Sequence, residues 1–231
     1  MQGRFVYTPD FERRLENALS SERLGAYREI LAPDAPFIDV ISVYNANTAA
    51  SEALMGPIQI MEISVRNSIH REISSRYGAD WYDGNKIGLD PSGNRAVTRL
   101  VRHYAASPRL ATPASLATKI VSELTLGFWT NLFQRQYEDP LWRKRLRQAF
   151  PYVGGALTRG DVYQALDKVR RLRNRISHHE QIVRYDLKLY YNSIIDLVSW
   201  VSPVTAIWLS HHNRFYDVMD TYKDILSLVR R

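Results

Sequence analysis

Apolar residues recur every three or four positions along almost the whole 231-residue chain, and this spacing constrains the fold more than any other feature. No stretch alternates apolar and polar residues over the length of a strand, so the pattern predicts helices rather than a sheet. Proline and glycine residues divide the pattern into segments of helical length. We therefore expect an all-α protein.

Turn residues and helix caps set the expected boundaries. Gly56-Pro57 ends one long helix and starts the next, Thr112-Pro113 is typical of an N-cap and first turn, and Asp161 is a suitable N-cap for a later helix. We expect helices over 10–20, 22–31, 37–55, 57–77, 95–107, 113–124, 128–137, 141–150, 161–177, 186–202 and 214–229.

The composition excludes several classes of protein. The chain has no cysteine, which rules out disulfides and thiolate metal sites. Residues 1–10 lack the apolar run of a signal peptide, and the longest apolar region, 187–209, is interrupted by polar residues and a proline. We expect a cytoplasmic protein with no membrane-spanning segment.

Positive charge is concentrated in one fifth of the chain. The net charge is +7, and residues 141–184 contain 11 Lys and Arg against 3 Asp and Glu, so this segment holds the whole excess. A concentrated basic surface favours a polyanionic partner such as RNA. The alternative is a solvated basic helix face with no partner.

The segment from Arg170 to Glu180 carries the chemistry. Its eleven residues include four arginines, one asparagine and two adjacent histidines. Arginine presents a fork of donors that matches phosphate oxygens, and histidine exchanges protons near neutral pH. RNA supplies its own nucleophile, the 2′-hydroxyl, so arginine and histidine together suffice to cleave it without a metal ion.

The spacing of Arg173 and His178 leaves two geometries open. On a continuous helix the two side chains would point about 140° apart. Either the helix ends near Ser177 and the chain turns back, or two copies of the chain assemble the site across a two-fold interface. The non-catalytic alternative is that the arginines complement the helix dipole and the histidines form a polar cap.

Residues 172–180 resemble the signature of the Abi-like (abortive-infection) family; their sequence is Leu-Arg-Asn-Arg-Ile-Ser-His-His-Glu. This family belongs to the HEPN superfamily, whose hallmark is an arginine followed, after four to six residues, by a histidine. Two further segments are similar to the same family: 59–70, followed by Tyr77-Gly78 and Trp81-Tyr82, and 122–129. The three segments stand in the family's order, and the similarity covers about 37–208.

The resemblance implies an all-α, HEPN-type helical bundle, with residues 1–36 as an N-terminal helical extension, 37–231 as the Abi-like domain, and extra helices at both ends. It implies a homodimeric, metal-independent and cofactor-free endoribonuclease that acts in phage defence or as a toxin, with RNA as its partner and any antitoxin undetermined. The catalytic positions it implies are Arg173, His178 and the polar neighbour Asn174. We assign RNA contacts to Arg170, Arg171, Arg175 and His179.

Other candidates have weaker patterns. Glu62, Arg66 and His70 form one ridge, which either supports the motif (Glu62 and Arg66 above all) or is an ordinary polar ladder. His211-His212 is a poor zinc candidate, because adjacent histidines diverge. Most of four aromatic residues at helical spacing are expected in the core rather than stacked on bases: Tyr190, Tyr191, Trp200 and Trp208.

Two alternatives to catalysis remain open. One is a module that binds RNA, a nucleotide or a protein without cleaving it. The other is a structural dimer in which the motif stabilises the interface.

Overall fold

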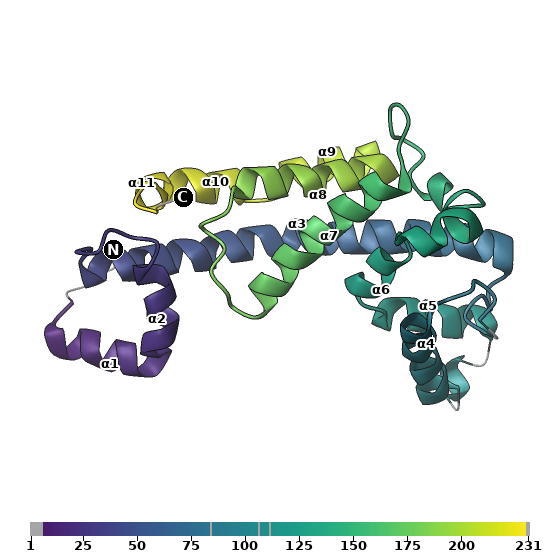
Figure 1. The fold of residues 1–231 in the computed structure, drawn as a ribbon, viewed down its shortest axis with the longest axis horizontal. Helices are drawn as coiled ribbons and strands as arrows, with labels where there is room; N and C mark the ends of the chain where they lie inside the picture. Colours follow the sequence, from purple (N-terminus) through teal and green to yellow (C-terminus); the bar gives the residue numbers. More distant parts are fainter. Residues whose placement is uncertain (1–6, 84, 106, 111, 230–231) are drawn as a thin grey trace. The chain divides into compact units, whose positions relative to one another are not determined.

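A computed structural model describes residues 7–83, 85–105, 107–110 and 112–229 (Figure 1). These residues form α-helices joined by turns, and no β-strand occurs among them, so the expected all-α class is confirmed. The HEPN arrangement remains a prediction. In chain order the helices are α1 (Pro9–Leu19), α2 (Ser21–Arg28), α3 (Phe37–Tyr77), α4 (Pro91–Tyr104), α5 (Pro113–Glu123), α6 (Leu126–Asn131), α7 (Arg159–Ser177), α8 (Leu187–Val201), α9 (Pro203–His211), α10 (Phe215–Thr221) and α11 (Lys223–Ser227).

The helices belong to two compact units, which are described separately. The first unit comprises Met1–Gly56, Leu172–Tyr191 and Asn213–Arg231, and the second comprises Pro57–Arg171 and Asn192–His212. These units divide the chain at positions other than the expected boundary at residue 36, and the division into 1–36 and 37–231 remains a prediction.

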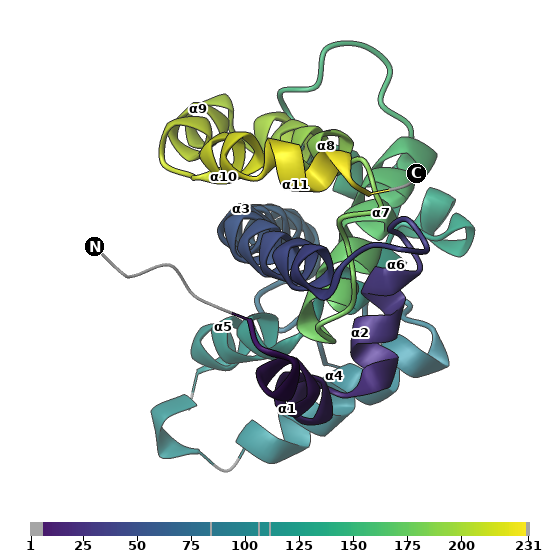
Figure 2. The ribbon, with the colours of Figure 1, turned by 90° about the vertical axis from the view of Figure 1, so that its left-hand side faces the viewer.

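The first unit has a core that joins segments far apart in the sequence. Leu24 and Tyr27 of α2 pack with Val40 of α3, Val183 of the loop after α7, and Val229 near the C-terminus. Within this unit α10 and α11 lie on the opposite side of α3 from α1 (Figures 1 and 2). The N-terminal helices therefore share a core with the loop that follows the motif.

The expected break at Gly56-Pro57 is wrong, because α3 continues through Pro57 as a single helix of 41 residues. A proline inside a helix costs about 3 kcal/mol. On either side of it Leu54, Ile58 and Met61 are almost completely buried, and burying each such side chain stabilises the fold by roughly 1.5–3 kcal/mol. The packing of the continuous apolar stripe thus outweighs the cost of the proline.

The second unit departs from the expected helix over 141–150. The chain forms a π-helical turn, Glu138–Trp142, and a 3₁₀ turn, Leu146–Ala149. Between them the backbone of Arg145 leaves the helical region with φ of −157°. Its guanidinium forms an ion pair with Glu72 of α3 at 2.8 Å.

Helix caps follow the expected chemistry with one shift of position. Thr112 caps α5 as predicted. Asp161 is not the N-cap of α7: the cap is Thr158, whose N–H donates to the Asp161 carboxylate at 2.9 Å while the Asp161 N–H donates to Thr158 Oγ1 at 3.2 Å. This reciprocal pair is a capping box.

The four aromatic residues at helical spacing differ in burial. Tyr191 is buried and stacks on Phe215 with ring centroids 4.4 Å apart, whereas Trp208 is 48% exposed and lies outside the core. Tyr190 and Trp200 are half-buried.

Candidate functional site

The motif helix α7 ends at Ser177, and the chain then turns back. The His178 N–H donates to the Asn174 carbonyl at 2.9 Å, the His179 N–H to the Ile176 carbonyl at 3.0 Å, and the Glu180 N–H to the Arg175 carbonyl at 2.8 Å. The last two bonds are the pair that defines a Schellman motif. Of the two geometries open from the sequence, the helix end near Ser177 is confirmed.

His179 occupies the left-handed position of this turn, with φ of 56°. Glycine is the usual residue there, because a side chain in this conformation costs about 1 kcal/mol. The imidazole is exposed and lies at the edge of two cavities, so the strained backbone carries a polar side chain into solvent-accessible space.

The loop after the turn is held by α2 and α3. The buried Asn47 of α3 accepts hydrogen bonds from the N–H of Ile182 at 2.7 Å and of Val183 at 3.3 Å. Arg23 of α2 donates to the carbonyl of His179 at 2.5 Å. In the other direction, Gln181 of the loop donates to the carbonyl of Ala26 in α2 at 3.1 Å. The position of the histidine turn is therefore fixed by the N-terminal helices as well as by α7.

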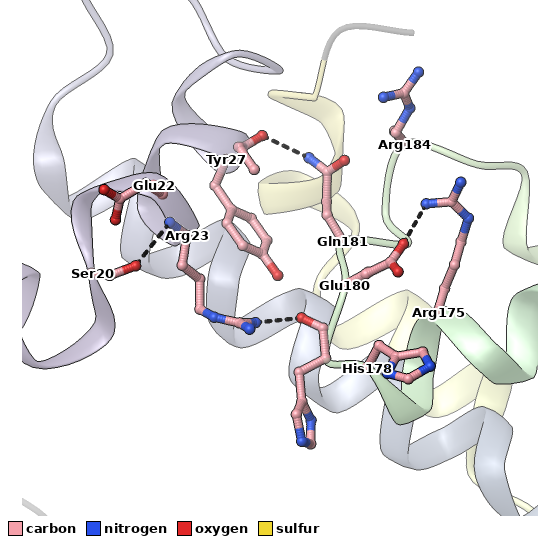
Figure 3. A pocket seen from close by; sticks show the side chains of 11 residues that line it. Ser20, Glu22, Arg23, Tyr27, Arg175, His178, Glu180, Gln181 and Arg184 are labelled. Carbon is pink, nitrogen blue, oxygen red and sulfur yellow. Dashed lines mark hydrogen bonds and ion pairs between the residues drawn. The ribbon is translucent and has the colours of Figure 1, made fainter.

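A cavity of about 490 Å³ opens beside this turn (Figure 3). His178 is exposed and lines the cavity together with three arginines, each from a different segment of the unit: Arg23 of α2, Arg175 of α7 and Arg184 of the loop. Such a set of guanidinium groups beside an imidazole suits a phosphate ligand.

Two carboxylates temper the positive charge of the cavity. Glu180 accepts a hydrogen bond from Arg175 at 2.7 Å, as Figure 3 shows, and both side chains are more than 40% exposed. Hydrogen bonds from its own backbone and from Ser20 lower the pKa of Glu22, so this carboxylate is ionised at neutral pH. The lining of the cavity thus contains three guanidinium groups and two carboxylates. The Arg175 guanidinium also lies over the ring of Tyr185, 5.1 Å from its centroid.

The predicted catalytic residues are only partly brought together. His178 lines the cavity with Arg175 and His179, two of the residues predicted to contact RNA. Arg173 and Asn174 are half-buried on α7 and are not among the residues that line it. In one copy of the chain, Arg175 lines the cavity with His178 and Arg173 does not, so the catalytic role that the resemblance implies for Arg173 stays a prediction.

The remaining predicted residues lie in the second unit. Arg170 and Arg171 both pair with Asp167, at 2.6 and 2.7 Å, so one carboxylate neutralises part of this basic stretch. Glu62 and Arg66 lie on α3, where Arg66 Nε is buried and has no hydrogen-bond partner among the described residues.

His70, on the same ridge as Glu62 and Arg66, has a structural role. Its Nδ1 accepts a hydrogen bond from Nε1 of the fully buried Trp81 at 3.1 Å and lies 3.2 Å from Ser74 Oγ. Burial lowers the pKa of His70. A neutral imidazole that accepts from Trp81 explains why the residue packs here.

Sequence reasoning missed Arg23, Asn47 and Gln181. Arg23 and Asn47 lie more than a hundred residues before the motif, and no local pattern marks them. Their roles depend on hydrogen bonds to the backbone of the loop, which have no signature in sequence. Arg184 lies inside the basic segment but had no assigned role.

Comparisons of the chain with protein-family models, curated proteins and solved structures return no match. The similarity to the Abi-like family therefore remains a proposal. Across the described part of the chain, no three His, Asp or Glu side chains are grouped so as to hold a metal ion. Every helix that the structure describes is too short or too polar to cross a membrane.

Proposed function

We propose that the protein is an endoribonuclease of the Abi-like type that cleaves RNA without a metal ion, with His178 transferring the proton. The observation that carries this proposal is the exposed imidazole of His178 in one cavity with Arg23, Arg175 and Arg184. An imidazole and several guanidinium groups are the two kinds of group that phosphodiester transfer within RNA requires.

The reaction balances without another reagent. His178 takes the proton of a ribose 2′-hydroxyl as its oxygen attacks the adjacent phosphorus. The bond from phosphorus to the 5′-oxygen then breaks, and that oxygen takes up the proton that His178 accepted from the 2′-hydroxyl. The products are a 2′,3′-cyclic phosphate and a 5′-hydroxyl. Arginine donors stabilise the charge that develops on the phosphorus oxygens.

A second copy of the chain gives Arg173 and Asn174 a part in this scheme. Both residues lie on the helix that carries the cavity arginine Arg175, but they do not line the cavity of their own chain. In an isologous dimer whose interface contains the motif helices, each motif helix faces its twin, so Arg173 of one copy approaches the substrate beside His178 of the other. This predicts a particle of twice the 26.8 kDa chain mass by sedimentation equilibrium.

The biological setting that we propose is abortive infection or toxicity in the cytoplasm. Cleavage of host or phage RNA would arrest growth. Expression of the wild-type chain should therefore stop growth, and His178→Ala should relieve the arrest at equal protein level. Growth arrest that persists at full strength in this variant contradicts the proposal.

Purified protein tests the chemistry directly. The wild-type chain should cut single-stranded RNA in the presence of EDTA and leave 2′,3′-cyclic phosphate ends. A strand with one deoxyribose at the cleaved position should stay intact there, because the nucleophile is missing. Cleavage that stops in EDTA, or that cuts beside the deoxyribose, would contradict the mechanism.

The two arginine assignments are separable in the same assay. Arg175→Ala and Arg173→Ala should both slow cleavage. Mixing Arg173→Ala with His178→Ala protein should restore part of the rate, because some heterodimers then hold one intact site. Failure of this mixture to recover activity, with heterodimers present, contradicts the shared site.

One observation favours a second candidate, a module that binds RNA without cutting it. The cavity around His178 lacks Arg173, the arginine that the motif pairs with this histidine. Salt-sensitive binding of RNA that stays uncut would favour this candidate.

A further inference from the structure

A second cavity adjoins the one that holds His178. It has a volume of about 410 Å³ and lies in the same compact unit. Arg23, Tyr27 and His179 line both cavities. The hydrogen bond from Arg23 to the His179 carbonyl joins two of these shared residues, so the cavities lie on either side of one narrow wall.

The two cavities differ in chemistry. The first contains three arginines and two carboxylates. The second has Arg23 and His179 at the shared wall, and its other lining residues carry no charge: Ala18, Leu19, Tyr27, Tyr44, Asn47, Thr48, Ser51 and Ile176. A flat ligand with apolar faces and a few polar edge groups suits such walls.

Three hydroxyl groups of the second cavity come from one face of α3. Tyr44, Thr48 and Ser51 are spaced four and three residues apart, which places them on the same side of the helix. The Thr48 hydroxyl donates to the Tyr44 carbonyl at 3.2 Å and keeps its acceptor capacity. Ser51 is half-buried and lines the cavity.

Two tyrosines form an aromatic wall. The rings of Tyr27 and Tyr44 lie 5.1 Å apart and are tilted by 55°. Tyr44 is half-buried, so part of its ring is open to the cavity. Aromatic faces of this kind stack on the unpaired bases of single-stranded RNA.

We propose that the second cavity is a nucleobase subsite: it binds the base of a nucleotide whose phosphate lies in the first cavity. This rests on the proposed function, and it adds that the protein distinguishes RNA sequences by the base beside the scissile phosphate. Tyr44 supplies a stacking surface, and the hydroxyl groups of Thr48 and Ser51 read the edge of the base.

Binding of uncleavable strands tests the subsite separately from catalysis. The probes are 2′-fluoro homopolymers of adenine, cytosine and uracil, which lack the nucleophile and keep the backbone charge. Fluorescence anisotropy with the full chain should show at least about tenfold tighter binding of the preferred base than of the weakest, a ratio typical of base stacking and edge contacts.

Two variants locate this preference. Ala18 is exposed and lines the cavity, so Ala18→Trp fills the subsite from its rim without disturbing the core. This variant should bind all three homopolymers within about twofold of one another. The matched control is Asn17→Trp, which adds the same side chain at an exposed neighbour that does not line the cavity. It should keep the wild-type ratio.

Ser51→Ala gives a smaller and more specific test. It should reduce the ratio severalfold, while Glu52→Ala, an exposed neighbour, leaves the ratio unchanged. Circular dichroism confirms that each variant is folded.

The outcomes separate the two proposals. A base preference that Ala18→Trp abolishes, in a protein that cuts no RNA, supports the subsite and refutes the endoribonuclease. Cleavage by a wild-type chain that binds the three homopolymers equally refutes the subsite alone. A preference that survives in folded Ala18→Trp also refutes it, and a chain that binds none of the strands refutes both.

Discussion

Replacement of Asn47 by alanine should release the loop that positions the histidine turn. Asn47 is 5% exposed, and its side-chain oxygen is the acceptor for the N–H groups of Ile182 and Val183, two residues that are themselves buried. Without this acceptor both N–H groups are buried and unsatisfied, at about 1–3 kcal/mol each. The bond to Val183 is the longer one and contributes the smaller part, so we expect a loss of about 3 kcal/mol.

Asn45 provides the matched control, because it lies two residues earlier on the same helix and is exposed. Urea unfolding should place Asn45→Ala within about 0.5 kcal/mol of the wild type. Hydrogen exchange gives the more specific readout: the amides of Ile182 and Val183 should be protected in the wild type and in Asn45→Ala and exposed in Asn47→Ala. If Asn47→Ala unfolds like Asn45→Ala, or if the two amides stay protected, the loop is not held by this side chain.

Three further substitutions test single features. His179→Gly should raise the free energy of unfolding by about 1 kcal/mol, measured in urea, because glycine adopts the left-handed conformation without strain; an equal gain in His179→Ala would contradict this reason. Glu180→Gln should lower the free energy of unfolding by less than about 1 kcal/mol, since the ion pair of Glu180 with Arg175 is exposed. The same variant should bind RNA more tightly than the wild type, with a larger gain at low salt than at high salt. Unchanged affinity at low salt would count against RNA in this cavity. Burial lowers the pKa of His70 below its ordinary 6.5, so the unfolded state binds a proton at this residue more readily than the folded state. The stability of the wild type should therefore fall as the pH drops from about 6.5 through the folded pKa. His70→Asn, which keeps an acceptor for Trp81, should lose less stability than the wild type between about pH 7 and pH 5 by thermal unfolding, and equal losses would refute the assignment.

The sequence predicted helices best where packing and local signals agree. The Thr112 cap and the end of α7 at Ser177 both follow from local chemistry. The break expected at Pro57 was wrong because the burial of Leu54 and Ile58 on one continuous stripe stabilises the helix by more than the proline destabilises it. Local reasoning also failed at Arg145, where the backbone leaves the helical region and the side chain pairs with the distant carboxylate of Glu72, a contact that residue spacing does not reveal.

The kinds of residue in the candidate site were predictable from the sequence, but the full set of residues that form it was not. The cluster of arginine and histidine in the motif predicted a site at the end of α7, where His178 is exposed and lines a cavity with three arginines. The sequence did not reveal Arg23 or Asn47, since their contacts are with backbone atoms of the loop. The pairing of His178 with Arg173, which the family resemblance implies, stays a prediction, since Arg173 does not line the cavity of its own chain.

Single-turnover cleavage of RNA in EDTA, by wild-type protein and by two histidine variants, tests the proposed role of His178 most directly. His178→Ala should lower the rate by about 10²–10⁴-fold, the usual contribution of a general acid or base, with folding unchanged. His211→Ala removes an exposed histidine that does not line the cavity and should cleave at the wild-type rate. Equal rates for all three proteins, or no cleavage by the wild type, would contradict the proposed mechanism.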